Sequence, residues 1–150
     1  MSAAFESIEG HESVLKAFGY WPAFHDAEAR SLVLDRNGVL FGKVADARVD
    51  LCLHALEWTK TEKPTVNHHL VHLHFHDVDE LVLRDFNHQN AIFELKIEEH
   101  LGQPDAPRQL KVTIVPAFGL AGSFNAACGR GSPHRYQFSH LRSQFSATVT

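Results

Sequence analysis

The sequence has few cysteines, no long apolar run and no excess of positive charge. Only Cys52 and Cys128 occur, and no CxxC spacing is present, so two reduced thiols are expected rather than a disulfide framework. No stretch approaches the ~20 apolar residues that a membrane-spanning helix needs. The acidic first residues also lack the apolar centre of a signal peptide. These absences predict a cytoplasmic protein with no membrane partner.

Basic residues are outnumbered by acidic ones. The 150 residues include 14 Lys and Arg against 18 Asp and Glu, which gives a formal net charge of -4. Nonspecific nucleic-acid binding needs a basic surface that neutralises phosphates, so no nucleic-acid partner is expected. A P-loop, a dinucleotide fingerprint and a Ser-His-Asp arrangement are absent too, and no catalytic residue is predicted.

Alternation of apolar and polar residues dominates the rest of the chain. Period two predicts strands that bury one face, whereas the apolar spacing of residues 7–18 predicts a helix that ends at Gly19. Tight turns between strands favour antiparallel pairing. The whole chain, 1–150, is therefore predicted to be a single, mainly β domain. We expect an antiparallel sandwich or partly open barrel of about seven strands with one N-terminal helix. The expected strands lie at 29–36, 45–55, 69–76, 80–86, 91–98, 110–116 and 124–128.

Residues that favour turns and loops separate these expected strands. Asn37-Gly38 predicts a two-residue hairpin turn, and the Gly and Pro residues of 100–108 and 129–133 predict loops. Residues 57–68 are expected to form a polar connection, and the small residues of 117–123 a turn. The tail after residue 133 is ambiguous, because Phe138, Leu141 and Phe145 have helical spacing while the last residues, SATVT, favour a strand.

Histidine is abundant, with 12 in the chain. His72, His74 and His76 project from one face of a predicted strand. With Glu80 they form a candidate site for zinc or another divalent metal, since His74-x-His76 and Glu80 have a local spacing found in the cupin metal pattern. In the alternative interpretation no cofactor binds, and the three histidines are the solvent-exposed face of the strand, opposite Val71, Leu73 and Phe75.

Two polar segments form a second candidate site. His25-Asp26 offers a general base with an orienting carboxylate, or part of a recognition site. Four consecutive polar residues at 87–90 offer a recognition surface. In both segments the structural alternative is that the side chains satisfy nearby backbone groups. The candidate binding residues are His25, Asp26, Asn87, His88, Gln89 and Asn90.

The same two segments carry a resemblance to a known family. Residues 18–28, FGYWPAFHDAE, and residues 83–90, LRDFNHQN, resemble the two motifs of the immunity protein 50 family, and the likeness extends over roughly residues 14–128. Ala29 and the histidine run depart from that family's pattern. The resemblance implies a bacterial protein of a polymorphic toxin system, which binds a cognate toxin without catalysis. It also implies that the motif residues define the fold or bind a ligand, while variable surface residues contact the toxin.

Three functions are thus compatible with the sequence. The first is an immunity-type protein whose partner is a cognate toxin domain. The second is a metal-dependent, cupin-like enzyme that uses His72, His74, His76 and Glu80. The third is a β domain that binds a small ligand or forms a homodimer through an exposed edge strand.

Overall fold

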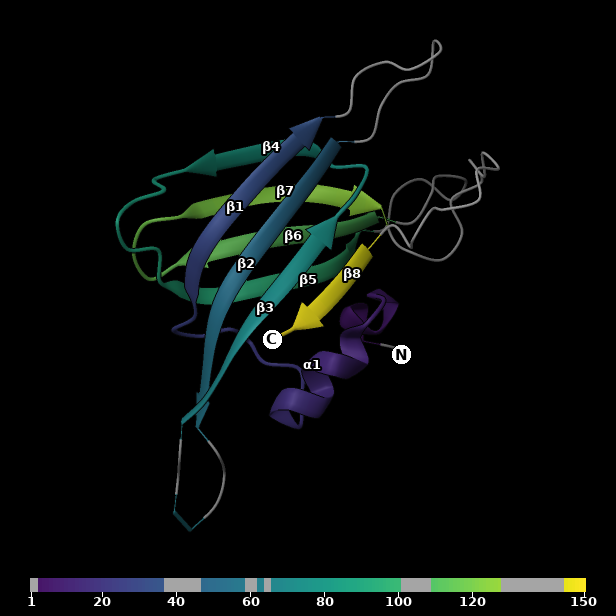
Figure 1. Cartoon of the computed structure of the whole chain (residues 1–150). Coiled ribbons are helices and arrows are strands. Elements are labelled where there is room, and N and C mark those ends of the chain that lie inside the picture. The colour runs from purple at the N-terminus through teal and green to yellow at the C-terminus, as the bar shows by residue number, and fades with distance from the viewer. Residues whose placement is uncertain (1–2, 37–46, 59–61, 64–65, 101–108, 128–144) are drawn as a thin grey trace.

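The computed structural model describes residues 3–36, 47–58, 62–63, 66–100, 109–127 and 145–150. In these segments the chain forms eight strands, one α-helix and one short 3-10 helix (Figure 1). Their bounds are η1 Ala4–Ser7, α1 His11–Phe18, β1 Glu28–Arg36, β2 Ala47–Trp58, β3 Val66–Phe75, β4 Asp79–Arg84, β5 Ile92–His100, β6 Gln109–Pro116, β7 Ala121–Ala127 and β8 Phe145–Val149.

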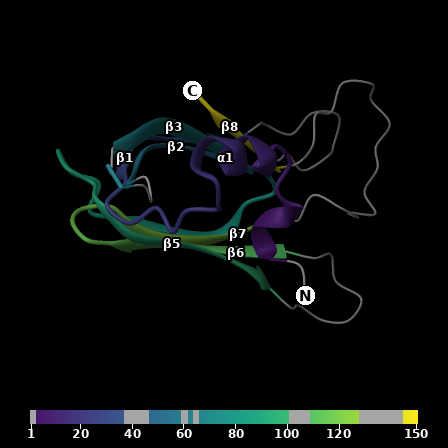
Figure 2. The ribbon, with the colours of Figure 1, turned by 90° about the horizontal axis from the view of Figure 1, so that it is seen from below.

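Two antiparallel sheets of four strands face each other. The first sheet has the order β1-β2-β3-β8 and the second has the order β4-β7-β6-β5. Figure 2 shows the two layers from below, with α1 beside β3 and β8 and η1 closer to the second sheet. The predicted mainly β, antiparallel sandwich is confirmed. In the described segments the sheets do not close into a barrel, and the strands number eight rather than about seven.

The core lies between the inner faces of the two sheets. Because opposite residues of an antiparallel pair point to the same side, the register Leu51↔Leu73 and Leu53↔Val71 brings four apolar side chains of β2 and β3 inward. All four are at most 1% exposed. Phe75 of the first sheet meets Phe124 of the second edge to face, with ring centroids 4.9 Å apart. Each such fully buried side chain contributes about 1.5–3 kcal/mol to stability.

The helix begins later than the sequence pattern predicts. Instead of one helix from residue 7, η1 ends at Ser7 and α1 starts at His11. Gly10 between them has φ +79°, and a Cβ at this position would lie 2.4 Å from the carbonyl oxygen of Ala147. The glycine is therefore needed for close packing against β8, and its left-handed conformation interrupts the helix.

The expected turn at residues 117–123 is partly wrong, because β7 already begins at Ala121. Small residues here belong to a tightly packed central strand. A Cβ on Gly122 would lie 2.6 Å from the Val82 carbonyl oxygen and from the Leu83 side chain on β4. The connection predicted at 57–68 is also shorter than expected, since β2 extends to Trp58 and β3 starts at Val66.

The C-terminal residues form a strand. β8 pairs with β3 through the register Val71↔Val149 and Leu73↔Ala147, and Ala147 is 2% exposed. The strand alternative for SATVT is thus confirmed. The Ala147 backbone N–H donates a hydrogen bond to the Glu9 backbone carbonyl oxygen at 2.9 Å, so the segment before α1 covers part of the free edge of β8.

Several predictions fall outside the described residues. They are the Asn37-Gly38 turn, the loops at 100–108 (apart from His100, which ends β5) and 129–133, the helical spacing of Phe138 and Leu141, and the state of Cys128. Cys52 is a free thiol. Neither helix in the described segments is long and apolar enough to cross a lipid bilayer.

Candidate functional site

The first motif segment, residues 18–28, leads the chain from the end of α1 to the start of β1. Trp21 stacks on Phe5 with ring centroids 5.0 Å apart, and its ring meets Phe24 edge to face at 5.8 Å. Phe24 is 1% exposed although its φ is +59°, a conformation that is costly for a bulky residue. Burial of the ring offsets this strain, so these aromatic residues build the fold.

The second motif segment is held by Asn90. Its amide oxygen Oδ1 accepts hydrogen bonds from the backbone N–H of Asn87 at 2.8 Å and of Leu120 at 3.1 Å. Its Nδ2 donates to the Asn87 carbonyl oxygen at 2.8 Å. The side chain therefore closes the loop at 87–90 and ties it to the start of β7. Asn90 is 3% exposed, so for this residue the structural alternative holds and it does not face solvent.

The two motif segments are joined directly. The Glu28 carboxylate accepts a hydrogen bond from the Asn90 backbone N–H at 2.6 Å. Backbone bonds continue the contact: Ala29 N–H donates to the Asn90 carbonyl, Ile92 N–H to the Ala27 carbonyl and Asp26 N–H to the Ile92 carbonyl. We call this joint, formed by residues 26–29 and 90–92, the clasp; Asp26 contributes its backbone N–H to it, while its side chain is exposed. It links β1 of the first sheet to β5 of the second sheet.

The other candidate binding residues point outward around the clasp. His25 Nδ1 lies 3.0 Å from Asp26 Oδ2, and their side chains are 55% and 71% exposed. The His25 ring also meets Phe93 edge to face at 5.0 Å. Asn87, His88 and Gln89 are exposed as well, and the His88 ring lies 5.9 Å from that of Phe118. These residues remain candidates for binding, whereas Asn90 and Glu28 hold them in place.

The four candidate metal ligands are not brought together. His72 and His74 lie on the outer face of the first sheet, but β3 ends at Phe75, and the His76 carbonyl already accepts a bond from Ala127 of the second sheet. Glu80 lies on the second sheet, where its carboxylate accepts a bond from Asn125. Among the described residues, no group of three or more His, Cys, Asp or Glu is placed to hold a metal ion. The prediction that His72, His74, His76 and Glu80 together form one metal site is therefore wrong.

The histidines of β3 instead contact residues of β2. His74 Nδ1 lies 2.6 Å from Asp50 Oδ1, and His72 Nε2 lies 4.0 Å from the Cys52 thiol. The register Asp50↔His74 and Cys52↔His72 explains both pairs, because opposite residues of two antiparallel strands share a face. The prediction that His72 and His74 share the outer face of a strand is confirmed.

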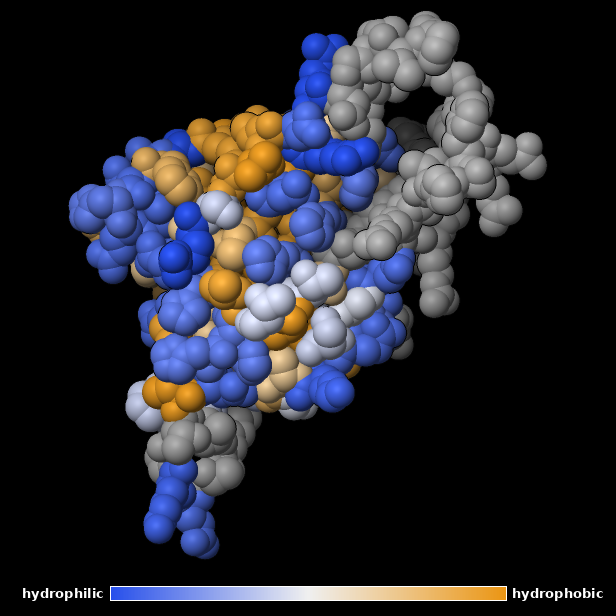
Figure 3. All heavy atoms as spheres, viewed as in Figure 1, coloured by the Kyte–Doolittle hydropathy of each residue, from blue (hydrophilic) through white to orange (hydrophobic). Residues whose placement is uncertain are grey.

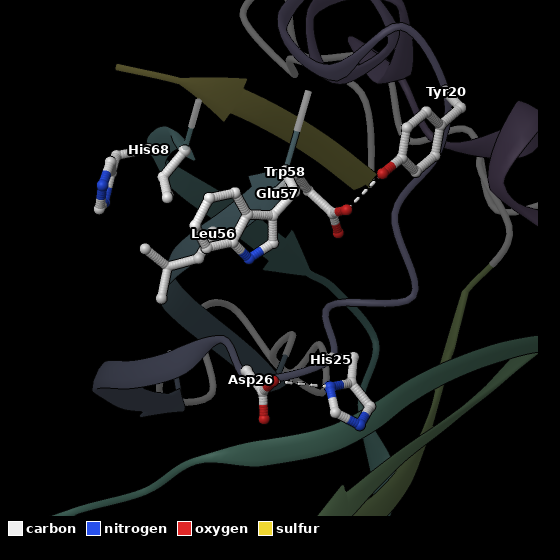
Figure 4. A pocket seen from close by; sticks show the side chains of 8 residues that line it. Tyr20, His25, Asp26, Leu56, Glu57, Trp58 and His68 are labelled. Atoms are coloured by element: carbon white, nitrogen blue, oxygen red, sulfur yellow. Dashed lines mark hydrogen bonds and ion pairs between the residues drawn. The ribbon is translucent and has the colours of Figure 1, made fainter. Parts of the chain in front are cut away.

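A hollow opens beside the exposed pair His25-Asp26. It has a volume of about 580 Å³, and its described lining residues are Tyr20, His25, Asp26, Leu56, Glu57, Trp58, Val66 and His68. We call it the Trp58 hollow. In the close view of Figure 4, His25-Asp26 and Tyr20-Glu57 form two bonded pairs on different sides, and the Trp58 indole is drawn beside Glu57. Trp58 is 65% exposed.

Tyr20 and Glu57 fix one wall of this hollow. The Tyr20 hydroxyl donates a hydrogen bond to the Glu57 carboxylate. This bond, together with burial and the negative charge of Glu57, raises the pKa of Tyr20 from 10.0 to about 12. At neutral pH the tyrosine is consequently a neutral hydrogen-bond donor that orients the Glu57 carboxylate.

The sequence predicted only part of this hollow. The residue pattern predicts a site at His25 and Asp26, whereas Glu57, Trp58 and His68 fall within the expected polar connection at 57–68. An isolated Trp at the end of an alternating strand was the available signal, because a large aromatic side chain in a polar stretch is unusual unless it serves an interface. Glu28 was also missed, although it closes the first motif segment.

Apolar side chains also reach the surface at one edge of the sandwich. Figure 3 shows hydrophobic atoms gathered where β1 and β4 lie in Figure 1. Both are end strands of their sheets. Val33 and Leu34 of β1 and Val82 of β4 are each more than half exposed. This edge is a second surface on which another chain could pack.

Comparison of the chain with protein families, with curated proteins and with solved structures finds no match to any of them.

Proposed function

We propose that the protein is an immunity-type protein of a bacterial polymorphic toxin system. In this proposal it acts in the cytoplasm, where it binds a cognate toxin domain and neutralises it without catalysis. The single observation that supports the proposal best is the clasp. Two segments that each resemble a motif of the immunity protein 50 family, and whose residues Glu28 and Asn90 are 62 positions apart, meet in one hydrogen-bonded joint.

The clasp gives the two motifs a shared physical role. Motif residues such as Phe24 and Asn90 are buried and bonded within the protein, which is expected where a motif defines a fold. They cannot contact a partner from their buried positions. The resemblance implies the same division, in which the motifs define the fold or bind a ligand and other surface residues meet the toxin.

Exposed aromatic side chains around the clasp supply a surface for such a partner. Phe86, Phe93 and Phe118 are each about half exposed, and Trp58 is 65% exposed. Aromatic residues are enriched at protein interfaces and supply much of their binding energy. A protein that neutralises by binding needs this kind of surface.

Co-expression tests the proposal. The protein is produced in bacteria together with the toxin domain encoded beside its gene, and growth is measured with and without it. We expect restored growth, and a stable complex when the protein is purified with a toxin inactivated by substitution. A cell that gains no protection, together with the absence of a complex, would contradict the proposal.

A further inference from the structure

We propose that the Trp58 hollow binds an arginine side chain of the partner protein. This inference deepens the proposed function, because it names the chemical group of the toxin that the hollow takes. It depends on that function only for the identity of the partner. It departs from the division that the resemblance implies, because it gives Asp26, an exposed residue of the first motif segment, a contact with that partner. The preference of the hollow for a guanidinium group follows from its own walls.

The walls carry negative charge and no described positive charge to balance it. Asp26 and Glu57 both line the hollow, and no Lys or Arg is among its described lining residues. Carboxylates are ionised at neutral pH. His25 Nδ1 lies 3.0 Å from Oδ2 of Asp26, and the Asp26 side chain is 71% exposed. The two carboxylates therefore favour a cationic group in the hollow, whereas a phosphate would be repelled.

The Glu57 carboxylate is held in a fixed orientation before any partner binds. Tyr20 donates a hydrogen bond to Oε2 of Glu57 and remains protonated at neutral pH. A carboxylate held by one donor can accept further donors at its other oxygen. This arrangement lowers the entropy that binding must offset, because Glu57 is already ordered.

Aromatic and apolar side chains favour arginine over a small cation. Trp58 presents its indole to solvent at the hollow, and a guanidinium stacks on indole better than on any other side chain. Leu56 and Val66 also line the hollow, where they can cover the methylene stem of a long side chain. The volume of about 580 Å³ lies within the ~300–1,000 Å³ of ordinary ligand pockets.

Arginine analogues test the preference without the toxin. The full chain is titrated with N-acetyl-arginine amide and with the uncharged isostere N-acetyl-citrulline amide, and the indole N–H resonances are followed by NMR. The chain has two Trp, and Trp21, stacked on Phe5, serves as the internal control. We expect a saturable shift of the Trp58 resonance by arginine, with a Kd on the order of 1 mM, and little shift of Trp21.

Paired substitutions identify the carboxylates. Asp26→Asn with Glu57→Gln should weaken arginine binding at least about tenfold, which is the loss of two charge-assisted contacts. The matched control is Asp85→Asn with Glu99→Gln. Asp85 is exposed and has φ +60°, close to the +62° of Asp26, and Glu99 is an exposed strand carboxylate. Equal shifts by citrulline, or undiminished binding in the Asp26/Glu57 variant, would overturn the inference.

The toxin experiment separates this inference from the proposed function. If the wild-type protein protects cells and the Asp26/Glu57 variant protects equally well, the arginine site is refuted and the immunity function stands. If the wild-type protein does not protect, the immunity function is refuted, and the analogue titration still decides whether the hollow binds a guanidinium. Loss of protection by the Asp26/Glu57 variant but not by its control supports both.

Discussion

The clasp and the Trp58 hollow take residues from the same segment, 20–28, and yet use them in opposite ways. In the clasp, polar side-chain atoms of Glu28 and Asn90 form hydrogen bonds with backbone groups of the protein, and Asn90 is almost fully buried. In the hollow, His25, Asp26 and Trp58 are more than half exposed. A buried polar group costs stability unless it is bonded, so the clasp must be complete. An exposed one is solvated by water and remains available to a partner.

This difference predicts whether a substitution should alter the stability of the protein or its binding to a partner. Changes in the clasp are expected to lower the free energy of unfolding and to affect binding only through loss of the folded protein. Charge-removing changes of exposed side chains in the hollow, such as Asp26→Asn, are expected to alter stability little and to act mainly on binding. The following experiments test whether the two regions are separable in this sense.

The largest effect is expected at Gly119, which packs on the clasp loop. Its φ is +79°, and a Cβ would lie 2.3 Å from the Gln89 carbonyl oxygen and 2.7 Å from Asn90 Oδ1. Gly119→Ala should therefore destabilise the protein by about 3 kcal/mol or more, as backbone strain and displacement of Asn90 combine. Chemical denaturation measures this change.

Gly19 provides the matched control for Gly119. Its φ is +81°, but nothing lies within 4 Å of the Cβ position. Gly19→Ala should cost only the left-handed conformation, about 1–2 kcal/mol. Equal losses in the two variants would show that crowding at the clasp is unimportant.

A somewhat smaller effect is expected for Asn90→Ala. The substitution removes the acceptor for the backbone N–H groups of Asn87 and Leu120 and the donor to the Asn87 carbonyl. Leaving a buried donor unsatisfied costs about 1–3 kcal/mol, so we expect a loss of about 2–3 kcal/mol in chemical denaturation. Gln89→Ala, at an exposed neighbour, should change stability by less than about 0.5 kcal/mol. Similar losses of stability in the two variants would show that the Asn90 side chain has no special role in holding the loop.

Much of the sandwich could be predicted from the sequence because its signals are local. Alternation along residues 45–55 and 69–76 fixed which faces of β2 and β3 are buried, and it placed His72 and His74 outside. The irregular parts depend on distant contacts. The helix start is set by the approach of Gly10 to Ala147, and the strand character of Gly122 by its approach to β4. No local pattern reports such contacts.

The same difference between local patterns and distant contacts explains which parts of the candidate site could be predicted. The two polar segments are predicted to share one site, and hydrogen bonds of the clasp join residues 26–29 to residues 90–92. The metal set failed because spacing along one strand could not show that the chain crosses to the other sheet after Phe75. The hollow needed β2 and the segment before β1 to meet, which only the folded structure shows. Trp58 and Glu57 were therefore missed.

A small effect on stability is expected at Asp26, in contrast to Asn90. Asp26 has φ +62°, a conformation that Asp and Asn adopt more readily than other residues with a Cβ. Asp26→Asn should change the free energy of unfolding by less than about 0.5 kcal/mol, and Asp26→Ala should cost about 1 kcal/mol through its backbone alone. Thermal and chemical denaturation test this. A loss for Asp26→Asn as large as that for Asn90→Ala would mean that the hollow and the clasp are one structural unit.

The smallest and most local effect concerns the proton of Tyr20. Its pKa of about 12 arises first from the hydrogen bond to Glu57, so Glu57→Gln should lower it toward the ordinary 10.0. With the only other tyrosine changed by Tyr136→Phe, ultraviolet absorbance of tyrosinate follows Tyr20 alone, and the unfolded chain gives the reference.

The sign of the linked pH dependence follows from the raised pKa of Tyr20. The folded protein keeps the Tyr20 proton at pH values where the unfolded chain has released it. The stability from this pair is therefore fully present below about pH 10 and is lost as the pH rises toward about 12. Glu57→Gln should abolish that loss. If Tyr20 instead titrates at its ordinary value in the wild-type protein, Glu57 is not oriented in advance, and the hollow must order this carboxylate only when the guanidinium arrives.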